Sequence, residues 1–205
     1  MNQKEVMLFP EKKLLTLSEL EEKLSYRHVP LIQFENLADE QEIYLKGLEQ
    51  EKRGEVSAQA LELGERYHSL ISSSYLSPAS VRWVHEAVGY GLFAEETIEK
   101  GAYVGEYTGI VRKNDRRYFE PLNNYCYEYP VQDEIGRNYV IDASQGCLTR
   151  FINHSFHPNL EPCYAYWKGY YHLIFLSLCK VEIGEQLSYN YGESYWYLRQ
   201  KPHGL

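Results

Sequence analysis

The fold of this chain depends on two stretches, Arg150-Phe151-Ile152-Asn153-His154-Ser155 and, about thirty residues later, Gly184-Glu185-Gln186-Leu187-Ser188-Tyr189-Asn190-Tyr191-Gly192. In the first stretch, Phe151 and Ile152 run into three polar side chains that would be costly to bury without hydrogen-bond partners. In the second, a strand would place Leu187, Tyr189 and Tyr191 on one face. The sequence therefore predicts a hydrogen-bonded polar segment and an aromatic slot with hydroxyl groups at its rim.

Each stretch alone also has an ordinary structural interpretation. Asn153-His154-Ser155 fits a turn or an N-glycosylation triplet, and a lone histidine beside apolar residues is more often a core residue than a functional one. Paired tyrosines at strand spacing usually only pack against each other. Two further patterns upstream favour a functional interpretation, namely Val88-Gly89-Tyr90-Gly91-Leu92-Phe93-Ala94 and Glu106-Tyr107-Thr108-Gly109.

In this order and spacing, the motifs resemble the SET-domain family of protein lysine methyltransferases. The match comprises G-x-G-L-F-A, E-Y-x-G, Y-x-[FY] at Tyr125-Cys126-Tyr127, R-F-I-N-H-S and G-E-x-L-x-Y-x-Y-G, and it covers about residues 81–196. Within the family, the chain is most similar to the compact SET proteins of chlamydia-type intracellular bacteria. That narrower resemblance implies a bacterial effector that resides in the bacterial cytoplasm and can be exported into a host cell and its nucleus.

Composition restricts the class of protein. The 205 residues suffice for one ordinary domain plus an extension, and 44% hydrophobic with 24% charged residues is typical of a soluble globular chain. No run approaches the roughly 20 apolar residues of a membrane span, and Met1 to Pro10 has no signal-peptide core. The four cysteines are widely spread, which favours free thiols over disulfides. A net charge of -8 disfavours nucleic acid and suits a basic protein partner.

Residues 1–78 are predicted to form an acidic, α-helical N-terminal extension. They contain nine Lys and Arg against fourteen Asp and Glu, a net charge of -5. Helix starts are predicted at Ser18-x-x-Glu21 and Asp39-x-x-Glu42, and a third helix over Val56 to Ile71. The extension can serve as a cover for the catalytic domain or as a partner-binding module. Its apolar residues Ile43, Leu48 and Tyr67 could equally contact a second copy of the chain, which would give a homodimer.

Residues 79–205 are predicted to be mainly β, with a short aromatic segment at their C-terminal end. Short apolar runs punctuated by glycine indicate strands after the linker at 72–80, and residues 127–131 and 138–143 are predicted to form a hairpin. The resemblance implies a SET fold of small twisted sheets with a C-terminal pseudoknot. That pseudoknot would bring Asn153-His154-Ser155 beside the closing tyrosines, although threaded chains are otherwise rare.

The implied chemistry is transfer of a methyl group from S-adenosyl-L-methionine to a lysine of a basic protein, a histone or a bacterial histone-like protein. Free lysine has a pKa of about 10.4, so its neutral form costs about 4.6 kcal/mol at neutral pH. A sulfonium about 4 Å away supplies roughly 4 kcal/mol of repulsion against the ammonium. The protein must then add orientation and exclusion of water.

The resemblance also implies roles for particular residues. Tyr191 matches the catalytic tyrosine of the closing motif, Tyr107 a tyrosine that lines the lysine channel, and Tyr189 the position whose hydroxyl limits the product to mono- or dimethyl-lysine. The residues implied in cofactor binding are Gly89, Tyr90, Gly91, Tyr125, Arg150, Phe151, Asn153, His154 and, as a surface for adenine, Trp196.

Two alternatives remain at this point. Cys147 stands where the family usually has asparagine, which raises the alternative of a catalytically weak SET-fold scaffold that acts through its helical extension. A zinc site is the other alternative, because Cys147, His154, His157 and Cys163 lie within seventeen residues. Their spacing fits no common zinc pattern, so we expect no metal.

Overall fold

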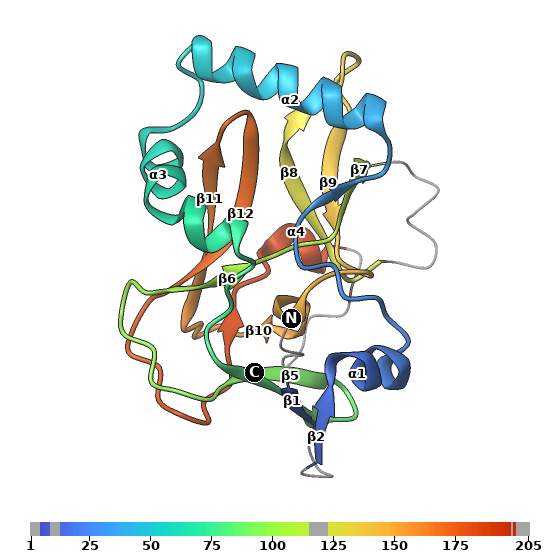
Figure 1. Ribbon diagram of the computed structural model, residues 1–205, viewed down its shortest axis with the longest axis vertical. Helices are drawn as coiled ribbons and strands as arrows, with labels where there is room; N and C mark the ends of the chain where they lie inside the picture. The colour runs from blue at the N-terminus through green and yellow to red at the C-terminus, as the bar shows by residue number, and fades with distance from the viewer. Residues whose placement is uncertain (1–4, 9–12, 115–122, 198, 200–205) are drawn as a thin grey trace.

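The computed structural model describes residues 5–8, 13–114, 123–197 and 199. The helices in these ranges are α1 (Leu17–Leu24), α2 (Leu37–Lys52), α3 (Ala58–Ser72) and α4 (Glu193–Trp196). In Figure 1, α2 lies across the top of the β-rich part and α3 lies along one side of it. No helix in the described ranges is both long enough and apolar enough to cross a membrane.

The strands of the described residues form small separate sheets. These are β1 (Glu5–Leu8) with β2 (Lys13–Thr16); β4 (Ala79–His85) with β5 (Gly89–Ala94); β11 (Leu160–Trp167), β12 (Tyr170–Ser177) and β6 (Tyr103–Glu106); β3 (Gln33–Phe34), β7 (Ile110–Lys113), β9 (Asn138–Asp142) and β8 (Cys126–Gln132); and β10 (Asn153–His154) with β13 (Ser188–Tyr189). Neighbouring strands are antiparallel except in the pairs β3–β7 and β10–β13. The predicted class, small sheets preceded by helices, is confirmed, as is the hairpin formed by β8 and β9.

The N-terminal extension is not purely helical, which corrects the prediction. It also contributes β1 and β2, and β3 adds a parallel strand to the sheet of β7, β9 and β8. Both predicted helix starts were wrong by a few residues. Thr16 and Glu19 form the capping box of α1, and Asn36 caps α2 through the backbone N–H of Asp39 at 2.9 Å. Several residues with capping-box spacing stand close together here, so spacing alone did not identify the true cap.

One hydrophobic core runs through the extension and the β-rich part. Leu20, Ile43 and Ala60 of the extension belong to the same buried cluster as Leu92 and Phe175 of the β-rich part. Burial of such side chains stabilises the fold by about 25 cal/mol per Å² of apolar surface. The two parts therefore contribute to each other's stability.

The apolar residues of the extension that were considered for a dimer have different environments. Ile43 is fully buried, and the Tyr67 ring packs against Tyr103 with 5.2 Å between centroids. Both thus contact their own chain. Of the three residues, only Leu48 is exposed to solvent, with 36% of its surface accessible.

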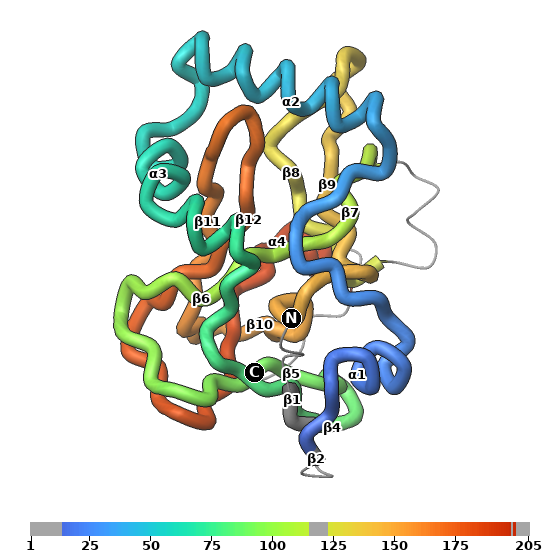
Figure 2. The backbone as a smooth tube through the Cα atoms, in the orientation of Figure 1, coloured from blue at the N-terminus to red at the C-terminus, as the bar shows by residue number. Residues whose placement is uncertain are grey.

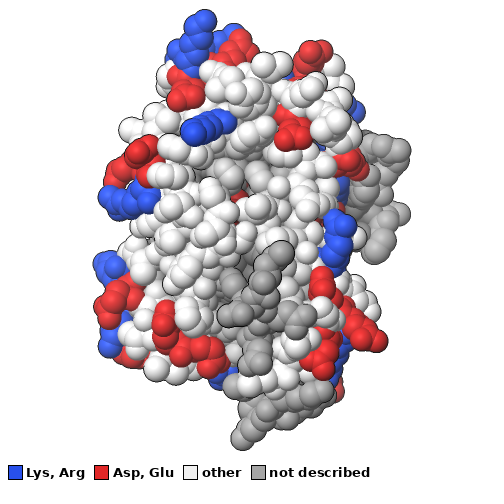
Figure 3. All heavy atoms as spheres, in the orientation of Figure 1, with Lys and Arg blue, Asp and Glu red and all other residues white. Residues whose placement is uncertain are grey.

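Charged side chains lie mainly around the outline of the face shown in Figure 3, and the part of its middle that is drawn in white is uncharged. On the exposed helix surfaces, acidic and basic residues often pair one helical turn apart, as in Glu49 with Arg53 and Glu62 with Arg66. Such exposed pairs contribute only about 0.3–0.5 kcal/mol each. The extension's acidic character is therefore partly neutralised locally.

Candidate active site

The closing stretch lies directly beside the Asn-His-Ser stretch. Strands β10 and β13 pair in parallel, with Asn153 opposite Ser188 and His154 opposite Tyr189. The backbone N–H of Tyr191 donates to Nδ1 of His154 at 3.2 Å. In Figure 2 the red C-terminal segment runs beside the orange segment that contains β10. This is the contact that the predicted pseudoknot required.

Two tyrosine hydroxyls of the site are fixed by backbone carbonyl groups. The Tyr107 hydroxyl donates to the carbonyl of Tyr125 at 2.9 Å, and the Tyr191 hydroxyl donates to the carbonyl of Ile152 at 2.9 Å. A phenol whose proton is engaged in this way has only lone pairs left for other partners. Each hydroxyl can therefore accept a hydrogen bond from an amine.

The aromatic rings of the site form a continuous wall. The Tyr189 ring lies 4.6 Å from that of Tyr191 and 5.1 Å from that of Phe175, measured between centroids. Tyr127 borders both Tyr107 and Tyr189, at 6.1 and 6.3 Å. No hydrogen bond joins the Tyr189 hydroxyl to another described residue, in contrast to the hydroxyls of Tyr107 and Tyr191.

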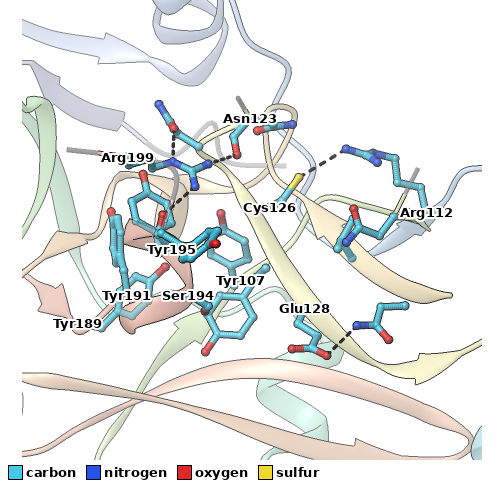
Figure 4. A pocket seen from close by; sticks show the side chains of 16 residues that line it. Tyr107, Arg112, Asn123, Cys126, Glu128, Tyr189, Tyr191, Ser194, Tyr195 and Arg199 are labelled. Carbon is cyan, nitrogen blue, oxygen red and sulfur yellow. Dashed lines mark hydrogen bonds between the residues drawn. The ribbon is translucent and has the colours of Figure 1, made fainter. Parts of the chain in front are cut away.

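The wall separates two cavities. A cavity of about 380 Å³ is lined by Tyr107, Tyr127, Tyr189 and Tyr191 together with residues of β8 and of the C-terminal segment (Figure 4). A second cavity of about 780 Å³ is also lined by Tyr107, Tyr189 and Tyr191. The three tyrosines that the sequence singled out as catalytic thus border both cavities at once.

The 780 Å³ cavity collects nearly all residues that were predicted to bind the cofactor. Its lining includes Gly89, Tyr90, Tyr125, Arg150, Phe151, Asn153, His154 and Trp196. Gly91 is not at its wall. A Cβ atom at Gly91 would come within 2.7 Å of Nε2 of Gln186 and 3.0 Å of Nδ2 of Asn153, so this glycine makes room for these two side chains. Gly89 has φ of +79° and open space around it, which suits backbone exposed to a ligand.

Polar groups in this cavity lack partners among the described residues. Nε of Arg150 and Nε1 of Trp196 are both buried and donate no hydrogen bond to the described residues. The Arg150 guanidinium instead stacks on aromatic rings, 4.0 Å from the centroid of Tyr125 and 4.8 Å from that of Tyr26. A ligand that carries a carboxylate and hydrogen-bond acceptors therefore fits this cavity, as S-adenosylmethionine does.

Two contributors to the site were missed by sequence reasoning. Tyr26 of the extension packs edge-on against Phe151 at 5.6 Å and lies next to Arg150. Arg199 donates to the side chain of Asn124 and to the carbonyls of Asn123 and Tyr195, at 2.8–2.9 Å. Arg199 thereby holds the C-terminal segment against the start of β8. No local pattern marks either residue, because each acts through contacts with distant parts of the chain.

Burial raises the pKa of all three wall tyrosines. For Tyr107 and Tyr189, the neighbouring phenols add to this effect, and for Tyr191 the phenol of Tyr195 does so. An ionised phenol would be poorly solvated there. The wall is therefore neutral near neutral pH and supplies lone pairs without a negative charge.

Cys147 does not line the 780 Å³ cavity. Its thiol donates to the carbonyl of Glu106 at 3.0 Å and also contacts the Thr149 hydroxyl, beside the short 3-10 helix η2 (Leu148–Phe151). No group of three or more His, Cys, Asp or Glu side chains in the described ranges converges as a metal site. Cys147, His154, His157 and Cys163 therefore do not come together as the zinc alternative required.

A comparison with protein families agrees with this geometry, since the model of the SET domain matches residues 89–192. The chain belongs to the SET domain family. The matched region begins at Gly89 of the large cavity and ends just after Tyr191. It thus contains all three wall tyrosines of the SET domain, but not Tyr26, Trp196 or Arg199.

Similar proteins are lysine methyltransferases. Histone-lysine N-methyltransferase EZH2 of Chaetomium thermophilum is 36% identical over 57% of this chain and 8% of that protein. N-lysine methyltransferase KMT5A-A of Danio rerio is 31% identical over 67% of this chain and 42% of that protein. A solved structure of the C. thermophilum polycomb repressive complex 2, autoinhibited and bound to S-adenosylmethionine, has a TM-score of 0.51 at 30% identity, over 60% of this chain and 16% of that chain.

These matches set the scope of the comparison. The chain spans less than half the length of both curated relatives. The relatives named here come from a fungus and a fish, so they do not support the narrower likeness to compact bacterial proteins. The SET domain of this chain is a homologue of protein-lysine N-methyltransferase domains.

Proposed function

We propose that this protein transfers a methyl group from S-adenosylmethionine to a lysine side chain of another protein. The observation that carries the proposal is the wall of Tyr107, Tyr189 and Tyr191, which borders both cavities. A donor in one cavity and an amine in the other would meet at this wall. That arrangement suits an in-line transfer between two molecules that enter from different sides.

The 780 Å³ cavity would hold the cofactor. The Arg150 guanidinium would bind its carboxylate, while the backbone at Gly89 and the buried Nε1 of Trp196 remain available for its polar groups. When bound, the cofactor supplies an electrophilic methyl group on a positively charged sulfur. The adenine surface that we assign to Trp196 belongs to this proposal.

The 380 Å³ cavity would receive the lysine. Its aromatic rings exclude water from the amine, and burial lowers the pKa of a lysine, so the proton can leave to solvent before transfer. The fixed hydroxyls of Tyr107 and Tyr191 would accept hydrogen bonds from the amine and direct its lone pair toward the other cavity. Because both phenols remain neutral, they position the nucleophile and do not act as bases.

The substrate class and the product are further parts of the proposal. The net charge of -8 favours association with a basic protein, such as a histone or a histone-like protein. The Tyr189 hydroxyl, which is free of hydrogen bonds to described residues, would occupy space beside the amine and limit the product to mono- or dimethyl-lysine.

A second candidate is a weakly catalytic SET-fold scaffold that acts through its helical extension. It was suggested by Cys147, whose thiol lies behind Glu106 and outside the 780 Å³ cavity. The substitution therefore removes no side chain from the described wall of that cavity. The enzyme is the better supported of the two functions.

The test is transfer of labelled methyl from S-adenosylmethionine to core histones and to basic bacterial proteins. We expect transfer by the wild type and a loss of about 10²-fold in Tyr191→Phe, which lacks the hydroxyl that orients the amine. Tyr44→Phe is the matched control, since Tyr44 lies on α2 outside both cavities. If neither the wild type nor Tyr191→Phe transfers methyl groups while calorimetry still detects cofactor binding, the enzyme proposal is rejected and the scaffold function is favoured.

The chlamydia-type origin, export into a host cell and nuclear localisation belong to the proposal through sequence resemblance alone. Immunoblotting of fractions from the source cells, and of host cells if the source is an intracellular bacterium, tests them. Detection in the producing cell's cytoplasm and in host nuclei is expected. Retention in the producing cell alone would end the effector interpretation.

A further inference from the structure

Glu128 lies where the 380 Å³ cavity meets a neighbouring groove. This groove, of about 470 Å³, runs between α2 and the β8–β9 hairpin. Glu128 and Asn138 line both the cavity and the groove. Figure 4 shows Glu128 among the residues that line the cavity. A peptide whose lysine occupies the cavity can therefore continue past Glu128 into the groove, toward a helix that lies outside the matched family region.

Glu128 differs in its charge balance from the other carboxylates of this surface. Glu49 and Glu55 of the groove are both paired with Arg53, at 2.5 and 4.0 Å, and Asp133 is paired with Arg137 at 2.7 Å. Glu128 is exposed and makes no ion pair with the described residues. It is thus a carboxylate at the rim of the 380 Å³ cavity with which no described cationic side chain pairs.

The Glu128 carboxylate is nevertheless held in place. Nδ2 of Asn138 donates to its Oε1 at 3.2 Å, and Nε2 of Gln132 donates to Oδ1 of Asn138 at 2.8 Å. The backbone carbonyl of Glu128 accepts a hydrogen bond from the Tyr164 hydroxyl. One carboxylate oxygen is therefore oriented by this chain of amides, while the other can accept a hydrogen bond from a ligand.

We propose that Glu128 selects substrates with an arginine or lysine close in sequence to the target lysine. The inference rests on the proposed function and adds the chemistry of the flanking residue. A carboxylate accepts hydrogen bonds without donating any. Its strongest hydrogen bonds are the charge-assisted ones from a guanidinium or an ammonium group. Because the pair would form at a wet rim, its contribution is to specificity and association rate more than to affinity.

The test uses the full chain and peptides with one lysine in a Gly/Ser background. Arginine, alanine or glutamate is scanned through each position around the lysine. At one position, we expect arginine to raise kcat/KM over alanine about two- to fivefold in the wild type, mainly through KM. Glu128→Gln should remove this preference, and Glu128→Lys should reverse it in favour of glutamate.

Glu134→Gln is the matched control, because it removes the same charge from the same hairpin but lies outside both the cavity and the groove. It should retain the arginine preference. The reversal in Glu128→Lys is a readout that general damage to the fold would not produce. Retention of the arginine preference in Glu128→Gln, or equal use of all flanking residues by the wild type, overturns the inference.

Binding of the same peptides, labelled and followed by fluorescence anisotropy, separates this inference from the proposed function. Arginine-dependent binding that is lost in Glu128→Gln, without methyl transfer, would support Glu128 and reject the enzyme. Methyl transfer that does not depend on Glu128 would support the enzyme and reject the role of Glu128 in selecting substrates. Absence of both binding and transfer for every peptide would overturn both.

Discussion

Tyr189 occupies a tightly packed position in the wall. Its ring is 7% exposed and lies between the rings of Phe175 and Tyr191, while its backbone pairs with His154. The ring is thus fixed by packing, and its hydroxyl remains without a hydrogen bond to the described residues. Removal of this hydroxyl should change the space beside the amine while leaving the wall in place.

Tyr189→Phe is therefore expected to shift the product toward higher methylation states without loss of the first transfer. The physical reason is that loss of the hydroxyl leaves more space beside the amine for added methyl groups. It also removes a group that could hold the amine by a hydrogen bond. Mass spectrometry of a methylated peptide over time measures the distribution. An unchanged distribution in Tyr189→Phe, alongside normal initial rates, would assign the limit on methylation to another residue.

The structure places Tyr107, Tyr189 and Tyr191, which the family motifs specify directly, in one wall. Their roles in catalysis stay predictions. Tyr26 and Arg199 could not be found in this way. Their contribution depends on which distant segment folds against them, and a single sequence does not contain that information.

Two helices approach the β11–β12 hairpin through glycine. A Cβ atom at Gly64 of α3 would lie 1.8 Å from the carbonyl oxygen of Tyr166, and one at Gly47 of α2 would lie 2.0 Å from that of Gly169. The obstructing atoms are backbone, which cannot rotate away. These glycines let both helices pack closely on the sheet that carries Phe175 behind the wall.

Gly64→Ala should consequently destabilise the protein by about 1–3 kcal/mol through overpacking, although alanine is about 1 kcal/mol better than glycine within a helix. Urea unfolding monitored by circular dichroism gives the change. Gln59→Ala, at an exposed position of the same helix, controls for helix propensity and should be neutral or slightly stabilising. A more stable Gly64→Ala protein would mean that α3 does not pack as described.

At the scale of elements, sequence reasoning was most accurate for the β8–β9 hairpin and for α3. Both have strong periodic patterns between clear turn residues. The strands β1, β2 and β3 were missed because an acidic segment with helical spacing dominates the extension. The two residues of β3 acquire their strand geometry only from pairing with β7, much later in the chain.

The whole molecule couples the extension to the large cavity. The Tyr26 ring packs on Phe151 and on the Arg150 guanidinium, while Leu20, Ile43 and Ala60 join the common core. The division at residue 78 into an extension and a SET domain stays a prediction about evolutionary units. In the folded chain, the extension supports residues that we assign to the cofactor.

Tyr26→Ala should therefore weaken binding of S-adenosylmethionine about tenfold, because Arg150 loses an aromatic neighbour whose cation–π contribution is about 0.5–2 kcal/mol. Tyr26→Phe keeps the ring and should bind nearly as well as the wild type. Isothermal titration calorimetry measures both affinities, with thermal unfolding as a check on folding. Equal affinity in Tyr26→Ala and the wild type would show that the extension does not influence the cavity.

The late position of β13 also affects how the protein matures during translation. Tyr189 and Tyr191 leave the ribosome after Tyr107 and after all of β10, so β10 must wait for its parallel partner. A nascent chain stalled before residue 188 would therefore contain most of the fold but would lack two of the three tyrosines that lie between its two cavities. Methyl transfer would therefore require that residues 188–191 have been synthesised and that β13 has paired with β10.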